Sequence, residues 1–128
     1  DYYNMIYDGV YWNIGVSGST STTGKTQYDK EKTSQTSTTL KVGLMYASDY
    51  GYAMNSGYKN NWLFTKGYEW TMTAYNASRP VYVNSTGGLD TSDAYTGYAV
   101  RPVLYLKSNV YVISGDGSEG NPYKIMLG

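Results

Sequence analysis

Short runs of apolar and β-branched residues, separated by clusters of Gly, Ser, Thr and Asn, recur along most of the chain. This pattern predicts short strands joined by turns. Residues 5–16 hold Asp8-Gly9 between two such runs, an arrangement typical of a hairpin. Residues 17–39 are rich in Ser, Thr, Lys and Gln without apolar periodicity. We therefore expect a long loop there, with one helical turn at residues 28–32.

The middle of the chain predicts a strand, a short helix and two apolar anchors. Residues 40–46 alternate between apolar and polar and then become continuously apolar, which indicates a buried strand. Ser48-Asp49 can cap a short helix that ends at Met54. Trp62 and Trp70 each lead a compact apolar group, and we expect both indole rings in the core.

The last third predicts two hairpins and one central strand. Residues 80–89 contain a strand followed by a glycine turn that permits positive φ, so a hairpin is expected. Residues 100–106 are apolar on both faces, as in a central strand, and should be the best protected strand. Residues 110–113 and 123–127 flank a Gly-rich loop and predict a closing hairpin.

The composition is that of a chain that folds as one domain, with 128 residues of which 41% are hydrophobic and 16% charged. Ten basic and ten acidic side chains give a net charge of zero. No long-range field therefore attracts nucleic acid or acidic lipid. Because the chain has neither a bilayer-spanning apolar run nor a signal-peptide pattern, we interpret residues 1–128 as a single domain excised from a longer exported protein.

The chain contains no Cys and no His, which excludes Ser-His-Asp and Cys-His catalysis, disulfides and the common zinc sites. The nearest carboxylate pairs in sequence are Asp90 with Asp93 and Asp116 with Glu119, and loop carboxylates of this kind favour turns. The loop at residues 115–122 matches neither an EF-hand nor a P-loop. The sequence thus predicts no enzyme, no cofactor and no metal site.

Tyrosine is the most unusual part of the composition, with seventeen Tyr against one Phe. A tyrosine joins an apolar ring to a hydroxyl that meets water, so it suits both half-exposed strands and contact surfaces. Many of these tyrosines stand among Asn, Ser and Gly in segments that are not expected to be strands. Such loops make adaptable contacts with a glycan or a protein. The candidate ligand-binding residues are Tyr50, Tyr52, Tyr58, Tyr75, Asn76, Tyr95 and Tyr98.

A specific series of motifs runs through residues 40–127. It includes Tyr46-Ala47-Ser48-Asp49-Tyr50, Asn61-Trp62-Leu63, Glu69-Trp70-Thr71, Val81-Tyr82-Val83-Asn84, Arg101-Pro102-Val103-Leu104 and Asn121-Pro122-Tyr123. The series resembles the C-terminal domain of uncharacterised surface and pilin-like proteins of Firmicutes. More distantly, the parts around Trp70, Val81 and residues 100–106 are similar to C-type-lectin-like folds. Those folds include the formylglycine-generating-enzyme type and the variable ligand-binding domains of diversity-generating retroelements.

The resemblance implies a β-rich α+β fold of the C-type-lectin-like kind. Its expected parts are a small twisted antiparallel sheet with hairpins, long loops and one or two short helices. It implies no activity, because the catalytic cysteines of the formylglycine enzymes have no counterpart here. The Glu-Pro-Asn and Trp-Asn-Asp signatures of calcium-dependent lectins are missing as well.

Two functions remain open at this point. The first is a non-catalytic binding or adhesion module on the extracellular cell surface. Its ligand would be a glycan or protein on a host or neighbouring cell, with no nucleic acid bound and no membrane insertion by this fragment. The alternative is a structural subunit domain of a pilus or cell-wall assembly, in which exposed tyrosines contact copies of the same chain.

Overall fold

The computed structural model describes residues 2–54 and 61–128, which form a β-rich α+β protein with two short α-helices, as predicted. The elements in chain order are η1 (Tyr2–Met5), β1 (Tyr11–Asn13), α1 (Gly24–Glu31), β2 (Ser37–Thr39), β3 (Val42–Leu44), α2 (Ala47–Tyr52), β4 (Glu69–Ala74), β5 (Pro80–Val83), β6 (Leu89–Thr91), β7 (Pro102–Leu104), β8 (Val110–Ser114) and β9 (Lys124–Leu127). Here η1 is a turn of 3-10 helix.

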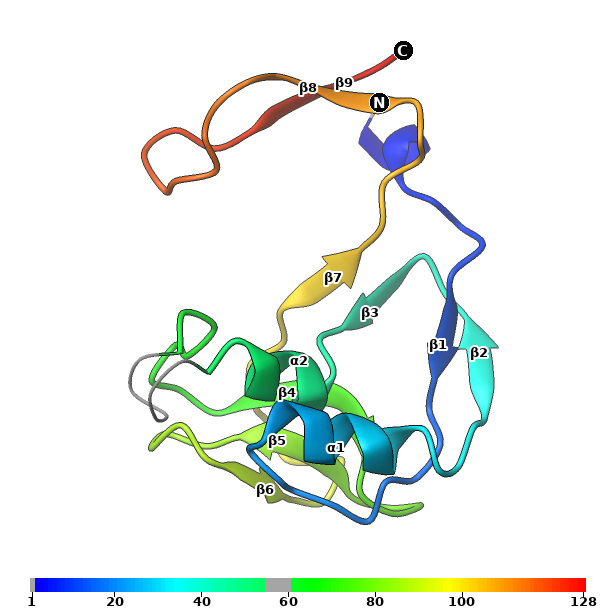
Figure 1. The fold of residues 1–128 in the computed structure, drawn as a ribbon, viewed down its shortest axis with the longest axis vertical. Helices are drawn as coiled ribbons and strands as arrows, with labels where there is room; N and C mark the ends of the chain where they lie inside the picture. Colours follow the sequence, from blue (N-terminus) through cyan, green and yellow to red (C-terminus); the bar gives the residue numbers. More distant parts are fainter. Residues whose placement is uncertain (1, 55–60) are drawn as a thin grey trace.

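The strands form four separate antiparallel sheets instead of one small sheet. The largest is β4-β5-β6. The helix α2 packs on one face of this sheet, and α1 packs beside α2 (Figure 1). The pairs β1-β2 and β3-β7 rise from it, and the hairpin β8-β9 lies beyond them near both termini. We call residues 108–128 the arm, and residues 8–54 and 61–104 the body.

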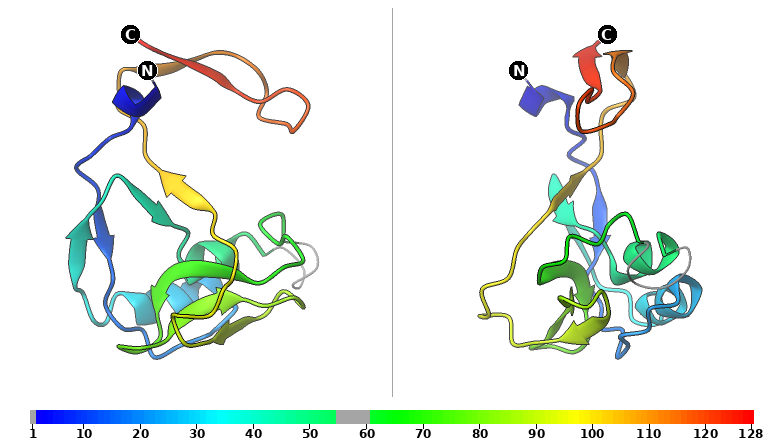
Figure 2. Two further views of the ribbon diagram at one scale, coloured as in Figure 1. Left: turned by 180° about the vertical axis from the view of Figure 1, so that it is seen from behind. Right: turned by 90° about the vertical axis from the view of Figure 1, so that its left-hand side faces the viewer.

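Residues 105–107 join the body to the arm, and they pair with the N-terminal segment. The Tyr7 N–H donates to the Tyr105 carbonyl at 2.8 Å, and the Lys107 N–H donates to the Met5 carbonyl at 2.9 Å. Figure 2 shows this narrow connection from two further directions. The position of the arm therefore depends on a few backbone contacts.

The hydrophobic core of the body lies between α2 and the inner face of the three-stranded sheet. Its side chains come from the segment before α2, from α2 itself and from β5 and β6, and the partly buried Leu63, Phe64, Tyr75 and Val103 surround them. Removing these apolar surfaces from water holds the sheet and the helix together. The buried members of this core cluster are Met45, Ala47, Tyr50, Val81, Val83 and Leu89.

Trp12 forms a second packing centre between β1 and β3. Its side chain is only 2% exposed, its ring centroid lies 6.2 Å from that of Tyr46 and 5.8 Å from that of Tyr105, and its Nε1 donates to the Leu40 carbonyl at 2.9 Å. Gly43 of β3 lies directly against the indole. A Cβ there would approach the ring to 2.8 Å, so this position requires glycine.

The hairpin predicted across Asp8-Gly9 is wrong. The strand β1 pairs with β2, with Tyr11 opposite Thr39. Tyr7, on the other side of Asp8-Gly9, pairs with Tyr105 instead. Both runs find partners far away in the sequence, so the local turn signal does not decide the pairing.

The segment 17–39 is not the long loop that was expected, because it contains α1 and β2. The residues that α1 buries are Gly24, Gln27 and Glu31. Gly24 allows close contact with α2, since a Cβ there would lie 2.6 Å from the backbone nitrogen of Tyr52. A helix that packs through glycine and buried hydrogen bonds has no apolar stripe, and hydrophobic periodicity cannot reveal it.

The segment 100–106 is not the central, best-protected strand that was expected. Only β7 is a strand, and its one partner is β3, in which Val42 lies opposite Leu104. Both of these side chains are 42% exposed, so β3 is not the buried strand predicted for residues 40–46 either. One face of this two-stranded sheet packs on Trp12, but among residues 2–54 and 61–128 no layer covers the face that carries Val42 and Leu104.

The two tryptophans expected in the core behave differently. Trp62 is 79% exposed, so the prediction is wrong for this residue, whereas the adjacent Leu63 and Phe64 pack partly against the core cluster. Trp70 is partly buried on the outer face of β4, outside the core cluster, so the prediction is wrong for this residue too. The outer position of Trp70 becomes important for the candidate site.

Other sequence predictions are confirmed. The strands β5 and β6 form a hairpin in which Gly87 has a φ of 89°, and β8 and β9 form the closing hairpin. The short helix expected near residues 48–54 is α2, which begins at Ala47. Its N-cap is Tyr46, whose N–H donates to the Asp49 carboxylate at 2.9 Å. None of the helices in the described residues is long and apolar enough to cross a membrane.

Candidate binding face on the three-stranded sheet

The central feature of the candidate site is an inverted polarity in β4. The side chains of Glu69, Thr71 and Thr73 are buried, whereas Trp70 and Met72 lie on the outer face. A sheet with one solvated face normally places its apolar residues inward. The outer face of β4 thus carries apolar side chains that the core does not need.

The inward polar residues of β4 are held by specific partners. The Thr71 hydroxyl donates to the Val81 carbonyl at 2.8 Å, and Glu69 pairs with Arg101 at 2.8 Å. Glu69 Oε1 is buried and has no hydrogen-bond partner within the described part of the chain. These interactions fix the register of β4 and therefore the outward direction of Trp70.

Strand pairing then places a row of side chains across the outer face. Trp70 lies opposite Tyr82 in β5, and Tyr82 lies opposite Asp90 in β6. Side chains directly opposite in an antiparallel pair are close enough to interact. An indole, a phenol and a carboxylate therefore stand side by side across the three strands.

Two further rings complete what we call the aromatic cluster, which consists of Tyr68, Trp70, Tyr82 and Tyr98. The ring centroid of Tyr98 lies 4.6 Å from that of Tyr82, 4.8 Å from that of Trp70 and 5.1 Å from that of Tyr68. The rings of Tyr68 and Tyr98 are stacked, with an interplanar angle of 18°. Tyr82 lies beneath and is buried, while Tyr68 is about half exposed.

The loop before β7 brings Tyr98 onto this face. Trp70 Nε1 donates to the Thr96 carbonyl at 3.3 Å, and the Trp70 N–H donates to the Ala99 carbonyl at 2.9 Å. The Ala99 N–H in turn donates to the Tyr68 carbonyl at 3.0 Å. The backbone of β4 therefore holds the loop, and the cluster does not depend on side-chain packing alone.

The environment of this face raises the pKa of two phenols, those of Tyr82 and Tyr95. Burial raises the pKa of Tyr82 to about 12, with smaller contributions from its hydrogen bond to Tyr98 and from the negative charge of Asp90. The pKa of Tyr95 is also raised, chiefly because its hydroxyl donates to Asp93. Both hydroxyl groups are therefore neutral at pH 7, and the exposed one, that of Tyr95, can contact a ligand.

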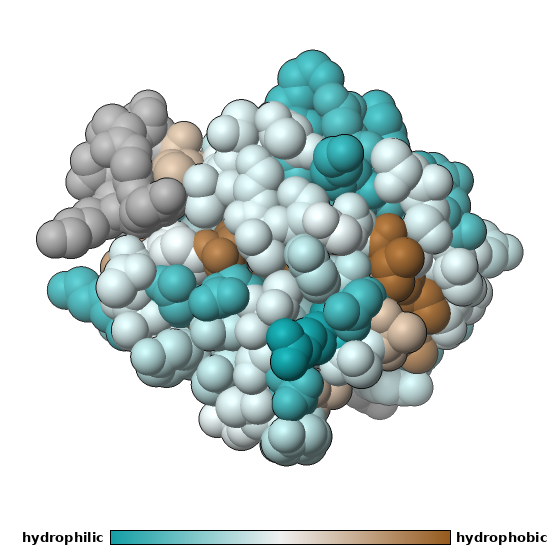
Figure 3. Space-filling view, turned by 90° about the horizontal axis from the view of Figure 1, so that it is seen from below, coloured by the Kyte–Doolittle hydropathy of each residue, from teal (hydrophilic) through white to brown (hydrophobic). Residues whose placement is uncertain are grey.

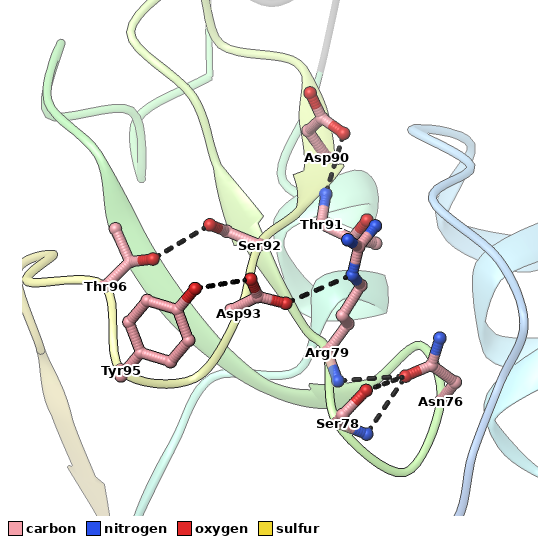
Figure 4. Close-up of polar contacts among 9 residues, drawn as sticks. All are labelled: Asn76, Ser78, Arg79, Asp90, Thr91, Ser92, Asp93, Tyr95 and Thr96. Atoms are coloured by element: carbon pink, nitrogen blue, oxygen red, sulfur yellow. Dashed lines mark hydrogen bonds and ion pairs between the residues drawn. The ribbon is translucent and has the colours of Figure 1, made fainter.

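A polar border lies at the far end of the same face (Figure 4). Arg79 Nε pairs with Asp93 Oδ1 at 3.3 Å, and the Tyr95 hydroxyl donates to Asp93 Oδ2 at 2.9 Å. Tyr95 is 88% exposed. Beside this border is a hollow of about 200 Å³, lined in part by Met72 and Asn76.

The structure distributes the predicted ligand-binding residues unevenly. Tyr98, Tyr95 and Asn76 come together around the outer face, whereas Tyr50 is 0% exposed in the core and donates its hydroxyl to the Gly87 carbonyl at 2.8 Å. Tyr52 is exposed on α2, on the other side of the body. Two further positions complete the set: Tyr75 is partly buried against the core cluster, and Tyr58 lies outside the described residues.

Sequence reasoning did not select Tyr68, Trp70 and Tyr82. A usable signal was present, because Glu69, Thr71 and Thr73 alternate with apolar residues, and this alternation marks a strand with two different faces. The missing information was which face the body covers.

Asn76 stabilises the turn between β4 and β5 in addition to lining the hollow beside the polar border. Its side-chain oxygen accepts hydrogen bonds from the N–H groups of Ser78 and Arg79, at 3.0 and 2.9 Å. Asn84 Oδ1 accepts from the Thr86 and Gly88 N–H groups in the same way, both at 3.0 Å. Each asparagine therefore shapes one hairpin of the sheet.

The candidate carboxylates are used locally. Asp90 accepts from the Thr91 N–H at 2.7 Å, and Asp116 accepts from the Ser118 N–H at 2.9 Å, while Asp93 pairs with Arg79. Within residues 2–54 and 61–128 there is no group of three or more Asp or Glu side chains that could hold a metal ion. No family model, curated protein or solved structure matches the chain.

Proposed function

We propose that the chain is a non-catalytic binding or adhesion module of an extracellular bacterial surface protein, and that its aromatic cluster binds a glycan. The proposal includes a C-type-lectin-like fold and kinship with the Firmicutes surface and pilin-like proteins that the motif series resembles. The observation that carries it is the inverted polarity of β4, which places Trp70 on the solvent-facing side of the sheet beside Tyr68 and Tyr98.

The chemistry of the face suits a neutral sugar. The C–H face of a pyranose is apolar and flat, so it packs on stacked rings such as Tyr68 and Tyr98. Sugar hydroxyls need acceptors and donors at the edge of those rings. The Asp90 carboxylate lies across from Tyr82, and the Ser85 hydroxyl donates to the Tyr68 hydroxyl at 3.3 Å. A chain of zero net charge also suits an uncharged ligand better than a polyanion.

A glycan array with the full chain, followed by calorimetry on the best hit, tests the proposal. Tyr68→Ala should weaken binding about tenfold or more, because it removes the exposed half of the stack. Tyr123→Ala is a matched control, since Tyr123 is a similarly exposed tyrosine on the arm and should bind as well as the unmodified chain.

Two results would reject glycan binding at this face. One is a folded sample that binds no glycan on the array, in which case a pull-down with surface proteins decides whether the ligand is a protein. The other is glycan binding that neither Tyr68→Ala nor Tyr123→Ala weakens.

A second function, assembly with copies of the same chain, has its own supporting observation in the arm. Among the named elements, the hairpin β8-β9 packs chiefly on itself. An isolated two-stranded hairpin is marginally stable in water, and its outer edges leave backbone groups unpaired. The large apolar side chains that the arm exposes are Tyr111, Val112, Ile113, Tyr123 and Met126.

The body carries a matching apolar stripe. Val42 and Leu104 are opposite each other on one face of the β3-β7 pair. Leu40 lies just before β3, and Leu106 lies just after β7 in the segment that leads to the arm. Each is 42–44% exposed. The arm of a second copy could cover this stripe. In a reciprocal dimer each copy contributes both its arm and its stripe, roughly 700 Å², close to the ~800 Å² that each partner contributes to a stable interface.

Charge does not oppose this contact. The arm contains Asp116, Glu119 and Lys124, so it is nearly neutral, and the whole chain has zero net charge. Two copies therefore approach without long-range repulsion.

Sedimentation equilibrium should detect a dimer or larger species at micromolar concentration, and Val112→Asp should shift it to monomer. Trp62→Lys, at another exposed apolar residue outside the arm, should not. A monomer at all concentrations would reject self-assembly through the arm.

A further inference from the structure

A second hollow, of about 270 Å³, lies between α1, β1 and the start of α2. We call it the tyrosine pocket, because Tyr11, Tyr28 and Tyr46 contribute to its walls. Glu31 and Asp49 also line it. Its volume is slightly below that of a typical drug-sized site, so a single slender group fits better than a large ligand.

Glu31 is the buried member of the lining. It is 6% exposed, and its carboxylate accepts hydrogen bonds from the Thr73 hydroxyl at 2.6 Å, the Ser48 hydroxyl at 2.5 Å, the Ser48 N–H at 3.1 Å and Gln27 Nε2 at 3.3 Å. These donors come from α1, α2 and β4, so three elements hold the carboxylate in one orientation. All four donors are neutral, which leaves the negative charge without a positive partner.

The contrast with Glu69 shows what Glu31 lacks. Glu69 is equally buried, and Arg101 pairs with it at 2.8 Å. Within the described part of the chain, Glu31 forms no ion pair. A buried carboxylate that is hydrogen-bonded only to neutral groups still gains from a cation nearby. Because Glu31 borders an open hollow, a ligand can supply that cation.

The rim of the pocket favours a cation too. Asp49 adds a second carboxylate, which the Tyr46 N–H holds by donating to Oδ2 at 2.9 Å. Lys32, the one cation in the lining, is engaged by Asp29 at 2.8 Å, and its ammonium lies 5.0 Å from the centre of the Tyr28 ring. The position of Lys32 illustrates that a tyrosine ring of this rim accepts an ammonium group on its face.

We propose that the tyrosine pocket binds the primary ammonium group of a lysine side chain from a partner peptide, with Glu31 and Asp49 as counter-charges and the tyrosine rings around the alkyl stem. The shape of a lysine suits both requirements, since its apolar stem packs on rings while its compact ammonium reaches a carboxylate. This site lies on a different part of the body from the aromatic cluster. The proposal of a lysine site is therefore independent of the proposal of glycan binding, and each is tested separately.

NMR titration of the full chain with blocked single amino acids tests the proposal. Nα-acetyl-lysine N-methylamide should give saturable shifts at the amides of Ser48 and Asp49, with a dissociation constant near the millimolar range. The norleucine analogue, which keeps the stem and lacks the ammonium, should bind at least about tenfold more weakly. Equal binding of the lysine and norleucine probes, equal binding of the arginine analogue, or no shifts with the lysine probe would each overturn it.

Variants then locate the site. Glu31→Gln keeps the size of the side chain and removes the charge, and it should weaken the lysine probe about tenfold or more. Since this change can also disturb the buried network, Asp49→Asn provides a second variant at the rim, with an expected loss of about threefold to tenfold. Asp116→Asn is the matched control, because Asp116 also accepts a backbone N–H at 2.9 Å but lies on the arm. A loss that Asp116→Asn shares, or no loss with Asp49→Asn, contradicts the assignment.

Discussion

The body and the arm are built from similar sequence material but differ in what covers it. In the body, α2 and the three-stranded sheet enclose the core cluster, and Trp12 is 2% exposed. In the arm, β8 and β9 pair with each other, and Val112 remains 54% exposed. Figure 2 shows the arm standing clear of the body. The opposite end of the molecule is mostly of intermediate hydropathy, with scattered strongly hydrophilic residues and small hydrophobic patches (Figure 3).

The difference shows that two strands can pair by hydrogen bonds without their side chains becoming buried. Pairing satisfies backbone hydrogen bonds in both regions, but apolar area leaves water only where a second layer packs on the strands. The arm therefore has secondary structure without a core of its own. Its stability rests on strand pairing, with little buried apolar area to add to it.

The largest expected effect is the difference between Trp12→Ala and Val112→Ala. Removing the buried indole leaves a cavity between β1 and β3 and should lower the free energy of unfolding by about 3–5 kcal/mol. Removing an exposed valine in the arm should change it by less than about 0.5 kcal/mol. Urea denaturation followed by near-ultraviolet circular dichroism measures both. Similar losses for the two variants would mean that the arm has a buried core.

Hydrogen exchange should separate the two regions without any substitution. Amides of β4 and β5 exchange only when the body opens, whereas amides of β8 and β9 exchange when the hairpin alone opens. We expect roughly 100-fold faster exchange in the arm, which corresponds to about 2.7 kcal/mol. NMR-detected exchange at several protein concentrations also tests self-assembly, because a partner copy should slow exchange in the arm selectively. Equal rates in both regions at low concentration would contradict the comparison.

A smaller effect is expected from the polar network that joins the layers of the body. Thr73 donates to Glu31 at 2.6 Å and accepts from the Ala47 N–H at 2.9 Å. Thr73→Val keeps the shape, removes one of the four donors to Glu31 and leaves the Ala47 N–H without its acceptor, so the free energy of unfolding should fall by about 1–3 kcal/mol. Ser114→Ala in the arm removes an exposed hydroxyl and should be silent. Thermal unfolding of both variants provides the test, and a silent Thr73→Val would show that the network does not stabilise the body.

The smallest effect appears only in strong base. The pKa of Tyr82 is raised to about 12 by burial, so the folded state favours the protonated phenol. The stability that this phenol contributes is complete below its unfolded pKa of about 10 and is lost as the pH rises through 12. Absorbance at alkaline pH should show one late ionisation step near pH 12 that Tyr82→Phe removes. A titration curve that Tyr82→Phe leaves unchanged would place the phenol in a more open environment.

Elements defined by local signals were predictable from the sequence. The hairpin of β5 and β6 follows from a strand and a glycine turn, and Gly87 has the positive φ that the turn needs. The closing hairpin and α2 were predictable for the same reason. In each case the residues that decide the structure lie within a few positions of one another.

Elements defined by distant contacts were not predictable. Asp8-Gly9 has a hairpin signal, yet β1 pairs with β2 because Trp12 needs a pocket that β3 helps to form. The helix α1 buries Gln27 and Glu31 against groups from α2 and β4, and a window of sequence cannot show such partners. The candidate site was half predicted: Tyr98, Tyr95 and Asn76 were selected, and the rings that accompany Tyr98 were not.

By itself, the sequence determined the class of protein, a small β-rich chain with zero net charge and neither imidazole nor thiol groups, because these properties follow from composition and short-range pattern. Only the tertiary structure decided which face of β4 meets solvent, which carboxylate is buried without a cation, and which apolar hairpin stays uncovered. The physical reason is that a surface is buried only when a second surface packs on it. The sequence of one strand states what its two faces are made of, and only the packing of the other layers states which face they cover.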